Sequence, residues 1–212
     1  MSEMDTFIND LSAQPAPTCR AHCLMKLFLT WAGVLILYIA AVVGFYLLPR
    51  PDLLQKLTQP LFAAEILSLG AMIFSSAFGA ALLGYPDGQQ KPWALWLPLA
   101  AFAVFVIIIA FAWHAYPLPP TVAWDGMKCT LCIALLSLPP VLFMSWQIRR
   151  MASVRPRLAA VNAFLAAFAV AALALRLSEP TDSMMHLAIF HYLPMLAAAA
   201  LGCLIGRRIF RW

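Results

Sequence analysis

Hydrophobic residues in this chain run in six long stretches, and the short segments between them hold most of the charged residues and prolines. A helix needs about 20 predominantly apolar residues to cross a bilayer core of about 30 Å, and each stretch reaches that length. The predicted helices cover residues 25–48, 61–84, 93–115, 129–148, 157–177 and 185–206. We therefore expect an all-α integral membrane protein, a six-helix transmembrane bundle within residues 24–212 that follows a polar tail of residues 1–23.

The composition leaves little room for a domain outside the membrane. Apolar residues make up 64% of the 212 residues and charged residues 11%, against about 25% charged residues in a soluble domain. The sequence also has no phosphate-binding glycine loop, no His-x-x-x-His pair and no recognisable order of Ser, His and Asp. We expect no enzymatic activity, no cofactor and no bound metal.

The lysines and arginines predict the orientation of the helices. Short cytoplasmic segments retain Lys and Arg, whereas outer segments carry few of them. With both termini in the cytoplasm, the inner segments hold ten cations and the outer segments four. The inner cations are Arg20, Lys26, Lys91, Arg149, Arg150, Arg155, Arg157, Arg207, Arg208 and Arg211, and the outer cations are Arg50, Lys56, Lys128 and Arg176. We expect cytoplasmic termini and no direct nucleic-acid binding, because the cations lie at helix ends and form no separate basic surface.

Few ionisable residues fall inside the predicted helices. Glu65 and Arg176 each lie about one helical turn from an outer end, and we expect Glu65 to extend toward the membrane interface. His114, His186 and His191 also lie toward outer ends. No ionisable residue sits at the bilayer centre, where transporters place their substrate sites. A small transporter is therefore an alternative that the sequence disfavours.

Cys129 and Cys132 are the sharpest chemical feature. They form the only Cys-x-x-Cys pair, at the outer start of the fourth predicted helix. Two such thiols can form a disulfide or share a soft metal ion, but they can also pack as small apolar side chains. A zinc site would need two more ligands, and the sequence has no second Cys-x-x-Cys. The pair is a candidate thiol sensor, and a membrane thiol-redox protein is a second alternative.

Other cysteines and small residues carry weaker signals. Cys19, His22 and Cys23 form a cytoplasmic cluster without a fourth metal ligand nearby. Small residues recur every four positions, at 71, 75 and 79, at 159, 163, 167 and 171, and at 198, 202 and 206. That spacing lets helices approach closely, which we interpret as packing within the chain. A homodimer seam is the alternative interpretation.

The polar tail contains one short amphipathic segment. Phe7, Ile8 and Leu11 share a face if residues 4–12 are helical, and Pro15 and Pro17 end any such helix. A helix this short is marginal in water, so it could fold on a partner with its apolar face as an anchor. A frayed terminus is the alternative.

Several segments together resemble a known family. The resemblance rests on residues 4–17 (MDTFINDLSAQPAP), 50–65 (RPDLLQKLTQPLFAAE), 129–157, 186–194 (HLAIFHYLP) and 206–212 (GRRIFRW). No single segment is diagnostic. Their order and spacing make the chain similar to the bacterial inner-membrane anti-sigma factors called negative regulators of sigma factor F.

This resemblance implies a function that composition does not. It implies a multi-pass inner-membrane protein that binds an extracytoplasmic-function sigma factor and releases it on envelope, oxidative or metal stress. Phe7, Ile8 and Leu11 would contact the sigma factor, and Cys129 and Cys132 would be the thiol sensor. Family members often carry another outer cysteine after the fifth helix. Here residues 176–183 read RLSEPTDS, without a cysteine, so a disulfide between the fourth and fifth helices is not expected.

Overall fold

The computed structural model describes residues 4, 6, 9, 23–86, 92–115, 126–151 and 153–210. Regular structure in these residues is entirely helical. In chain order, the elements are α2 (Leu24–Ala41), η1 (Val42–Leu47), α3 (Leu53–Leu57), α4 (Pro60–Gly84), α5 (Pro92–Ala115), α6 (Gly126–Arg149), α7 (Pro156–Ser178), α8 (Met184–His186), η3 (Leu187–Tyr192) and α9 (Leu193–Ile209).

Six of the helical segments are long and apolar enough to cross a membrane, which confirms the expected number of such helices. They are Leu24–Leu47, Pro60–Gly84, Trp96–Ala115, Gly126–Arg149, Pro156–Ser178 and Met184–Ile209. The first combines α2 with the π-helix η1, and the last combines α8, the π-helix η3 and α9.

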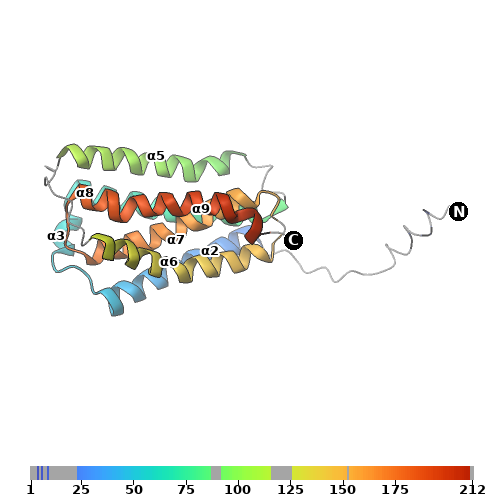
Figure 1. Cartoon of the computed structure of the whole chain (residues 1–212), viewed down its shortest axis with the longest axis horizontal. Helices are drawn as coiled ribbons and strands as arrows, with labels where there is room; N and C mark the ends of the chain where they lie inside the picture. The colour runs from blue at the N-terminus through green and yellow to red at the C-terminus, as the bar shows by residue number, and fades with distance from the viewer. Residues whose placement is uncertain are drawn as a thin grey trace.

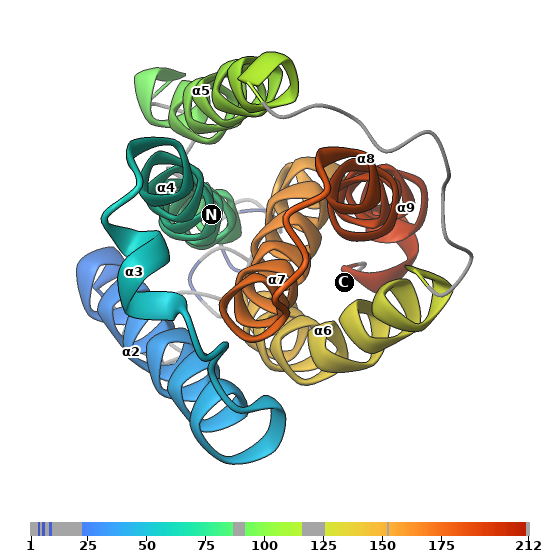
Figure 2. The ribbon, with the colours of Figure 1, turned by 90° about the vertical axis from the view of Figure 1, so that its left-hand side faces the viewer.

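The long helices run side by side along one axis of the molecule (Figure 1). The short helices α3 and α8 lie together at one end, which we call the α3 end. Seen from that end, α7 occupies the middle of the bundle, and α5 lies at the periphery beside α4 (Figure 2). Helix α7 packs against α4, α6 and α9, so three neighbours close around it.

Helix α7 is central because its side chains are small. In the apolar window of this helix, 83% of residues are buried, compared with 17% in the window of α5. Nine alanines of α7 are fully buried: Ala159, Ala160, Ala163, Ala166, Ala167, Ala169, Ala171, Ala172 and Ala174. Small side chains let neighbouring helix backbones approach, so the small-residue repeat of this helix packs within the chain.

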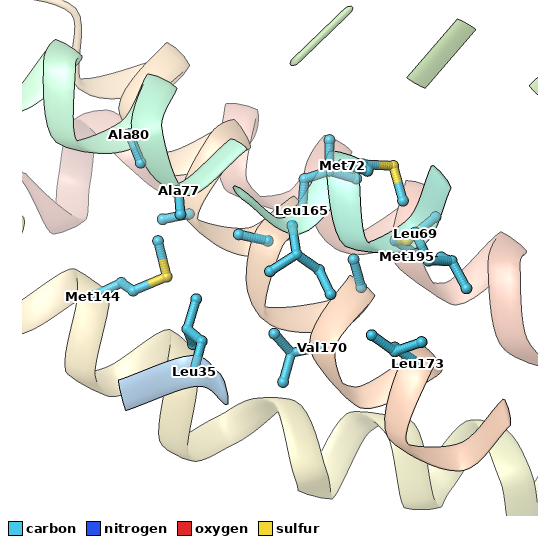
Figure 3. Close-up of a cluster of buried hydrophobic side chains, with 14 of the residues drawn as sticks. Leu35, Leu69, Met72, Ala77, Ala80, Met144, Leu165, Val170, Leu173 and Met195 are labelled. Atoms are coloured by element: carbon cyan, nitrogen blue, oxygen red, sulfur yellow. The ribbon is translucent and has the colours of Figure 1, made fainter. Parts of the chain in front are cut away.

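Larger apolar side chains fill the space around α7 (Figure 3). The labelled residues come from five helices and meet in one cluster: Leu35, Leu69, Met72, Ala77, Ala80, Met144, Leu165, Val170, Leu173 and Met195. This core holds α2, α4, α6 and α9 onto α7, and the buried charged side chains Glu65 and Arg176 lie toward the helix ends.

Candidate functional site

A buried ion pair joins α4 and α7 near the α3 end. Arg176 Nε lies 2.9 Å from Glu65 Oε1 and its Nη2 lies 3.2 Å from Glu65 Oε2, a two-bond contact between a guanidinium and a carboxylate. The side chains are 3% and 2% exposed, and the Tyr192 hydroxyl also donates to Glu65. The expectation that Glu65 extends to the interface is therefore wrong, because a cation at the same depth on α7 holds it inside.

The buried pair continues into the loops through Asp182. This carboxylate accepts hydrogen bonds from Arg176 Nη1 at 3.2 Å and from Arg50 Nη1 at 3.1 Å, and Lys56 Nζ lies 2.6 Å away. Arg50 also binds Asp52 through two bonds of 2.6 and 2.9 Å. Burial alone would raise the pKa of Asp182, but the hydrogen bonds from its three cationic neighbours outweigh it and hold that pKa well below the usual value.

A second polar cluster lies at the same end of the bundle. It consists of Cys129, Glu179, His186 and His191, and we call it the thiol–histidine cluster. Glu179 is its centre: Oε2 lies 3.5 Å from Cys129 Sγ and 3.0 Å from His191 Nε2, and Oε1 lies 3.3 Å from His186 Nε2. The ligand atoms of all four side chains lie within 4.8 Å of one another.

A π-helical turn brings the two histidines together. Residues five apart on an α-helix are turned by about 140° from each other, so His186 and His191 would point to different sides of a regular helix. In η3 the Leu193 N–H instead binds the Ala188 carbonyl, five residues back, and the two imidazole centroids lie 5.4 Å apart. The widened turn therefore creates the pairing of the histidines.

The sequence around Pro194 supports this π-helical turn. Proline has no N–H, so Pro194 cannot donate to the carbonyl of Phe190, four residues earlier. Thr130 of α6 supplies the missing bond, because its Oγ1 donates to the Phe190 oxygen at 3.0 Å. Thr130 is the neighbour of Cys129 in sequence, so the same bond fixes α6 and its thiol beside the histidines.

The charge of the cluster is set by Glu179. Burial would raise the pKa of this carboxyl, but contacts with His191, Thr181 and His186 lower it to about 2. Glu179 is thus ionised at neutral pH. His191 is fully buried, and its Nε2 is close to Glu179 without the alignment of a hydrogen bond. Its Nδ1 has no hydrogen-bond partner among the residues that the structure describes.

The two cysteines of the predicted sensor have different surroundings. Both pack against the apolar group formed by Ile133, Ala171, Ala172 and Leu175, and Cys129 in addition contacts the charged Glu179. Both thiols are free. Their role as a sensor stays a prediction.

Other predicted residues lie elsewhere. Phe7, Ile8 and Leu11 of the tail, and Cys19 and His22, lie outside the described residues. Cys23 and His114 are exposed. None of the described residues among these belongs to the thiol–histidine cluster.

Sequence reasoning missed the roles of Glu179, His186 and His191. A search for His-x-x-x-His spacing fails because these histidines are separated by four residues, a spacing that only a widened turn makes useful. The available signal was Pro194, three residues after His191, where a proline disturbs the helix. Glu179 lies in the stretch noted for its missing cysteine, and its carboxylate is 3.5 Å from the Cys129 thiol.

Comparisons with known proteins agree with one another. A family model described as negative regulator of sigma F matches residues 11–212. The chain is 32% identical over 171 residues to the probable anti-sigma-F factor NrsF of Azospira oryzae, covering 77% of this chain and 78% of that protein. It is 27% identical over 175 residues to the anti-sigma-F factor NrsF of Caulobacter vibrioides, covering 79% and 80%. No solved structure matches the chain.

Proposed function

The chain belongs to the negative regulator of sigma F family, and from that premise we propose that it is a multi-pass anti-sigma factor of the bacterial inner membrane. It binds an extracytoplasmic-function sigma factor, keeps it from RNA polymerase, and releases it on an envelope, oxidative or metal stress signal. The observation that carries this proposal is the family match over residues 11–212, together with six helices able to cross a membrane. The relatives are regulators by name, in keeping with a protein that is not an enzyme.

The gathering of arginines at one end of the bundle supports cytoplasmic termini. At the α3 end, the described Arg50, Lys56 and Arg176 are all paired with carboxylates. The opposite end carries exposed arginines: Arg149, Arg150, Arg155, Arg157, Arg207 and Arg208. Positive residues are retained in the cytoplasm, so the α3 end faces outward and the arginine end faces inward.

The tail of residues 1–23 is the proposed contact with the sigma factor. It precedes α2, which begins at the arginine end, so it shares the cytoplasm with its partner. Phe7, Ile8 and Leu11 act as apolar anchors, and the segment of residues 149–157 assists. Cys129 and Cys132 at the outer end act as the thiol sensor, because modifying Cys129 would disturb its contact with Glu179.

The direct test is recovery of the sigma factor with the protein. The tagged full chain is extracted in mild detergent at low salt without oxidant, and co-purified proteins are identified by mass spectrometry. Two variants serve as comparisons: a chain lacking residues 1–23, and a chain with Phe7→Ala, Ile8→Ala and Leu11→Ala. A small sigma factor should accompany the full chain and be lost from both variants.

Two other results would contradict parts of this proposal. If no sigma factor accompanies the full chain, anti-sigma binding is refuted. If the sigma factor persists on the chain without residues 1–23, its contact lies elsewhere, and the tail assignment is wrong.

A further inference from the structure

We propose that Cys129, Glu179, His186 and His191 form a binding site for a divalent transition-metal ion of the Zn²⁺ class. The sequence predicted no metal site because the cysteine pair lacked two more ligands. The structure supplies a carboxylate and two imidazoles around one of those thiols, with all four ligand atoms within 4.8 Å of one another.

The spacing of these atoms is close to that of a tetrahedral zinc centre. Zn–N bonds of about 2.0–2.1 Å and a Zn–S bond of about 2.3 Å place the donor atoms about 3.3–3.6 Å apart. The contacts of Glu179 with His191, His186 and Cys129 measure 3.0, 3.3 and 3.5 Å. The four ligand atoms lie within 4.8 Å of one another, so side-chain rotations that close the wider separations would surround an ion.

The chemistry of the four ligands selects the class of ion. One thiolate, two imidazoles and one carboxylate are the donors that Zn²⁺ takes in proteins. Ca²⁺ and Mg²⁺ prefer sets made of oxygen atoms alone, so they fit this cluster poorly. Softer relatives of zinc, such as Cd²⁺, share the preference for thiolate and imidazole.

The buried imidazoles point to a ligand independently of the spacing. His191 is 0% exposed, and the Nε2 atoms of both His191 and His186 are buried without an aligned hydrogen bond among the described residues. A buried polar atom without a partner is costly, and an ion at the centre of the cluster would satisfy both nitrogens. A charged Glu179 would offset part of the charge of the ion.

The ligands come from three separate parts of the chain. Cys129 lies in the first turn of α6, Glu179 follows the end of α7, and the histidines lie on α8 and η3. An ion would thus fix α6, α7 and the last span to one another at the α3 end. Helix α7 is the central helix, and Arg157 is its second residue, at the arginine end. A shift of α7 at the α3 end could therefore reach the arginine end of the bundle.

Metal binding can be tested independently of the anti-sigma role. Any effect of the ion on sigma release, in contrast, rests on the proposed function. The test uses the full chain purified in detergent with a tag that contains no histidine. Zn²⁺ content is measured after dialysis, and Zn²⁺ affinity is measured by competition with a chromogenic chelator. Co²⁺ then replaces Zn²⁺, because Co²⁺ bound to a thiolate gives a distinctive visible absorption.

The variants separate this cluster from other thiols and histidines. Cys129→Ser, Glu179→Gln and His186→Gln each remove one ligand. Cys132→Ser and His114→Gln are the matched controls, since Cys132 is not one of the four clustered ligands and His114 is exposed elsewhere. Size-exclusion profiles and melting temperatures identify any variant that fails to fold. His186→Gln is the safest ligand variant, because His186 is partly exposed.

The expected result is one Zn²⁺ per chain in the wild type and in both controls. Loss of an outer partner of a metal ligand already costs about 10–100-fold in affinity, so each ligand variant should lose at least tenfold. The thiolate absorption of Co²⁺ should vanish in Cys129→Ser and persist in Cys132→Ser. A wild-type chain that keeps no Zn²⁺, or folded ligand variants with unchanged affinity, would overturn the proposal.

A sigma-dependent reporter gene distinguishes metal binding at this site from an effect of the ion on sigma release. If Zn²⁺ or Cd²⁺ induces the reporter with the wild-type chain and not with Glu179→Gln, the ion acts through this cluster. If the purified protein binds Zn²⁺ while the reporter ignores it, the site stands and its link to sigma release is refuted. Sigma binding itself is read from the co-purification described above, which needs no added metal.

Discussion

At the scale of single residues, the pairing of Glu65 with Arg176 explains how two charged side chains can be buried inside the bundle. Both side chains are almost fully buried, and each satisfies the other through two hydrogen bonds. Removing one partner of a buried pair leaves an unpaired charge in a medium of low dielectric constant. The presence of the pair is therefore weak evidence that it adds stability. Removing either member alone should nevertheless lower the stability strongly.

We predict that Glu65→Met lowers the free energy of unfolding in detergent by about 3–5 kcal/mol. The double variant Glu65→Met with Arg176→Met should recover much of this loss, because no lone charge stays buried. Asp52→Asn is the control: Asp52 is 39% exposed and its buried partner Arg50 also binds Asp182, so this change leaves no unpaired buried charge and should cost less. Equal melting temperatures for Glu65→Met and Asp52→Asn would contradict the buried pair.

Asp182 gives the α3 end a dependence on pH. Arg50 and Lys56 from the segment around α3, and Arg176 from α7, face this carboxylate, while Asp52 and Glu65 share two of those cations. Because the pKa of Asp182 is lowered in the folded state, its contribution to stability is complete above its unfolded pKa of about 3.9. That contribution is lost as the pH falls further toward the folded pKa.

We therefore predict that Asp182→Asn melts at a lower temperature than the wild type at pH 7, with a difference that shrinks below about pH 4. The measurement is a melting curve in detergent at several pH values. A difference that stays constant from pH 7 to pH 3 would mean that the ionised carboxylate is not the stabilising group.

None of these residue-scale pairings could be predicted from the sequence. Glu65 and Arg176 are separated by 111 positions, and each alone looked able to reach the membrane interface. Only the packing of α4 against α7 shows that they meet. The same holds for Glu179, whose meaning depends on the thiol that α6 places opposite it.

At the scale of elements, the run length of apolar residues predicts the six long helices well, because each run has the length that a helix needs to cross a bilayer. It does not predict the π-helical turn η3. That turn depends on the absence of a backbone N–H at Pro194 and on the hydrogen bond from the Thr130 hydroxyl of α6 to the Phe190 carbonyl. The candidate site needs that turn. This is why the helices could be predicted and the cluster of histidines could not.

We predict that Thr130→Val lowers stability by about 1 kcal/mol, since the Phe190 carbonyl loses its partner while the shape of the side chain is kept. Thr30→Val is a matched control, because the Thr30 hydroxyl bonds only within its own exposed helix face. The two changes are compared by their melting temperatures in detergent. A smaller loss in Thr130→Val than in Thr30→Val would show that the bond does not hold η3.

Glycines of α9 allow its close contact with α7. A Cβ atom at Gly202 would lie 2.9 Å from the Ala160 oxygen, and one at Gly206 would lie 2.8 Å from the Pro156 oxygen. These are backbone atoms, so the helices would have to separate. Gly70 and Gly33 have nothing within 4 Å of the same position.

We predict that Gly202→Ala destabilises the protein, whereas Gly70→Ala is neutral or stabilising by up to about 1 kcal/mol through higher helix propensity. Melting temperatures in detergent provide the comparison. If both changes raise the melting temperature, α9 does not pack against α7 as closely as the distances indicate.

At the scale of the whole molecule, the two ends of the bundle have opposite character. The α3 end holds the ion pairs and the thiol–histidine cluster, while the other end presents exposed arginines on its surface. The six helices and their order along the chain could be predicted from the sequence, but the pairing of Arg50, Lys56 and Arg176 with carboxylates could not. The proposed orientation therefore rests on the ten-to-four count of Lys and Arg, because the retention of cations in the cytoplasm follows their number and not the net charge.

Orientation can be measured by cysteine labelling in intact cells. In a chain whose own cysteines are replaced by serine, Leu54→Cys and Val154→Cys introduce single thiols on the two ends, at positions that are 83% and 56% exposed. A reagent that cannot cross the membrane should label Leu54→Cys in intact cells and Val154→Cys only after the membrane is broken. The reverse pattern would place the arginine end and the tail outside, where no sigma factor could reach them. Since an anti-sigma factor must face the cytoplasm, that single result would refute the proposed function along with the topology.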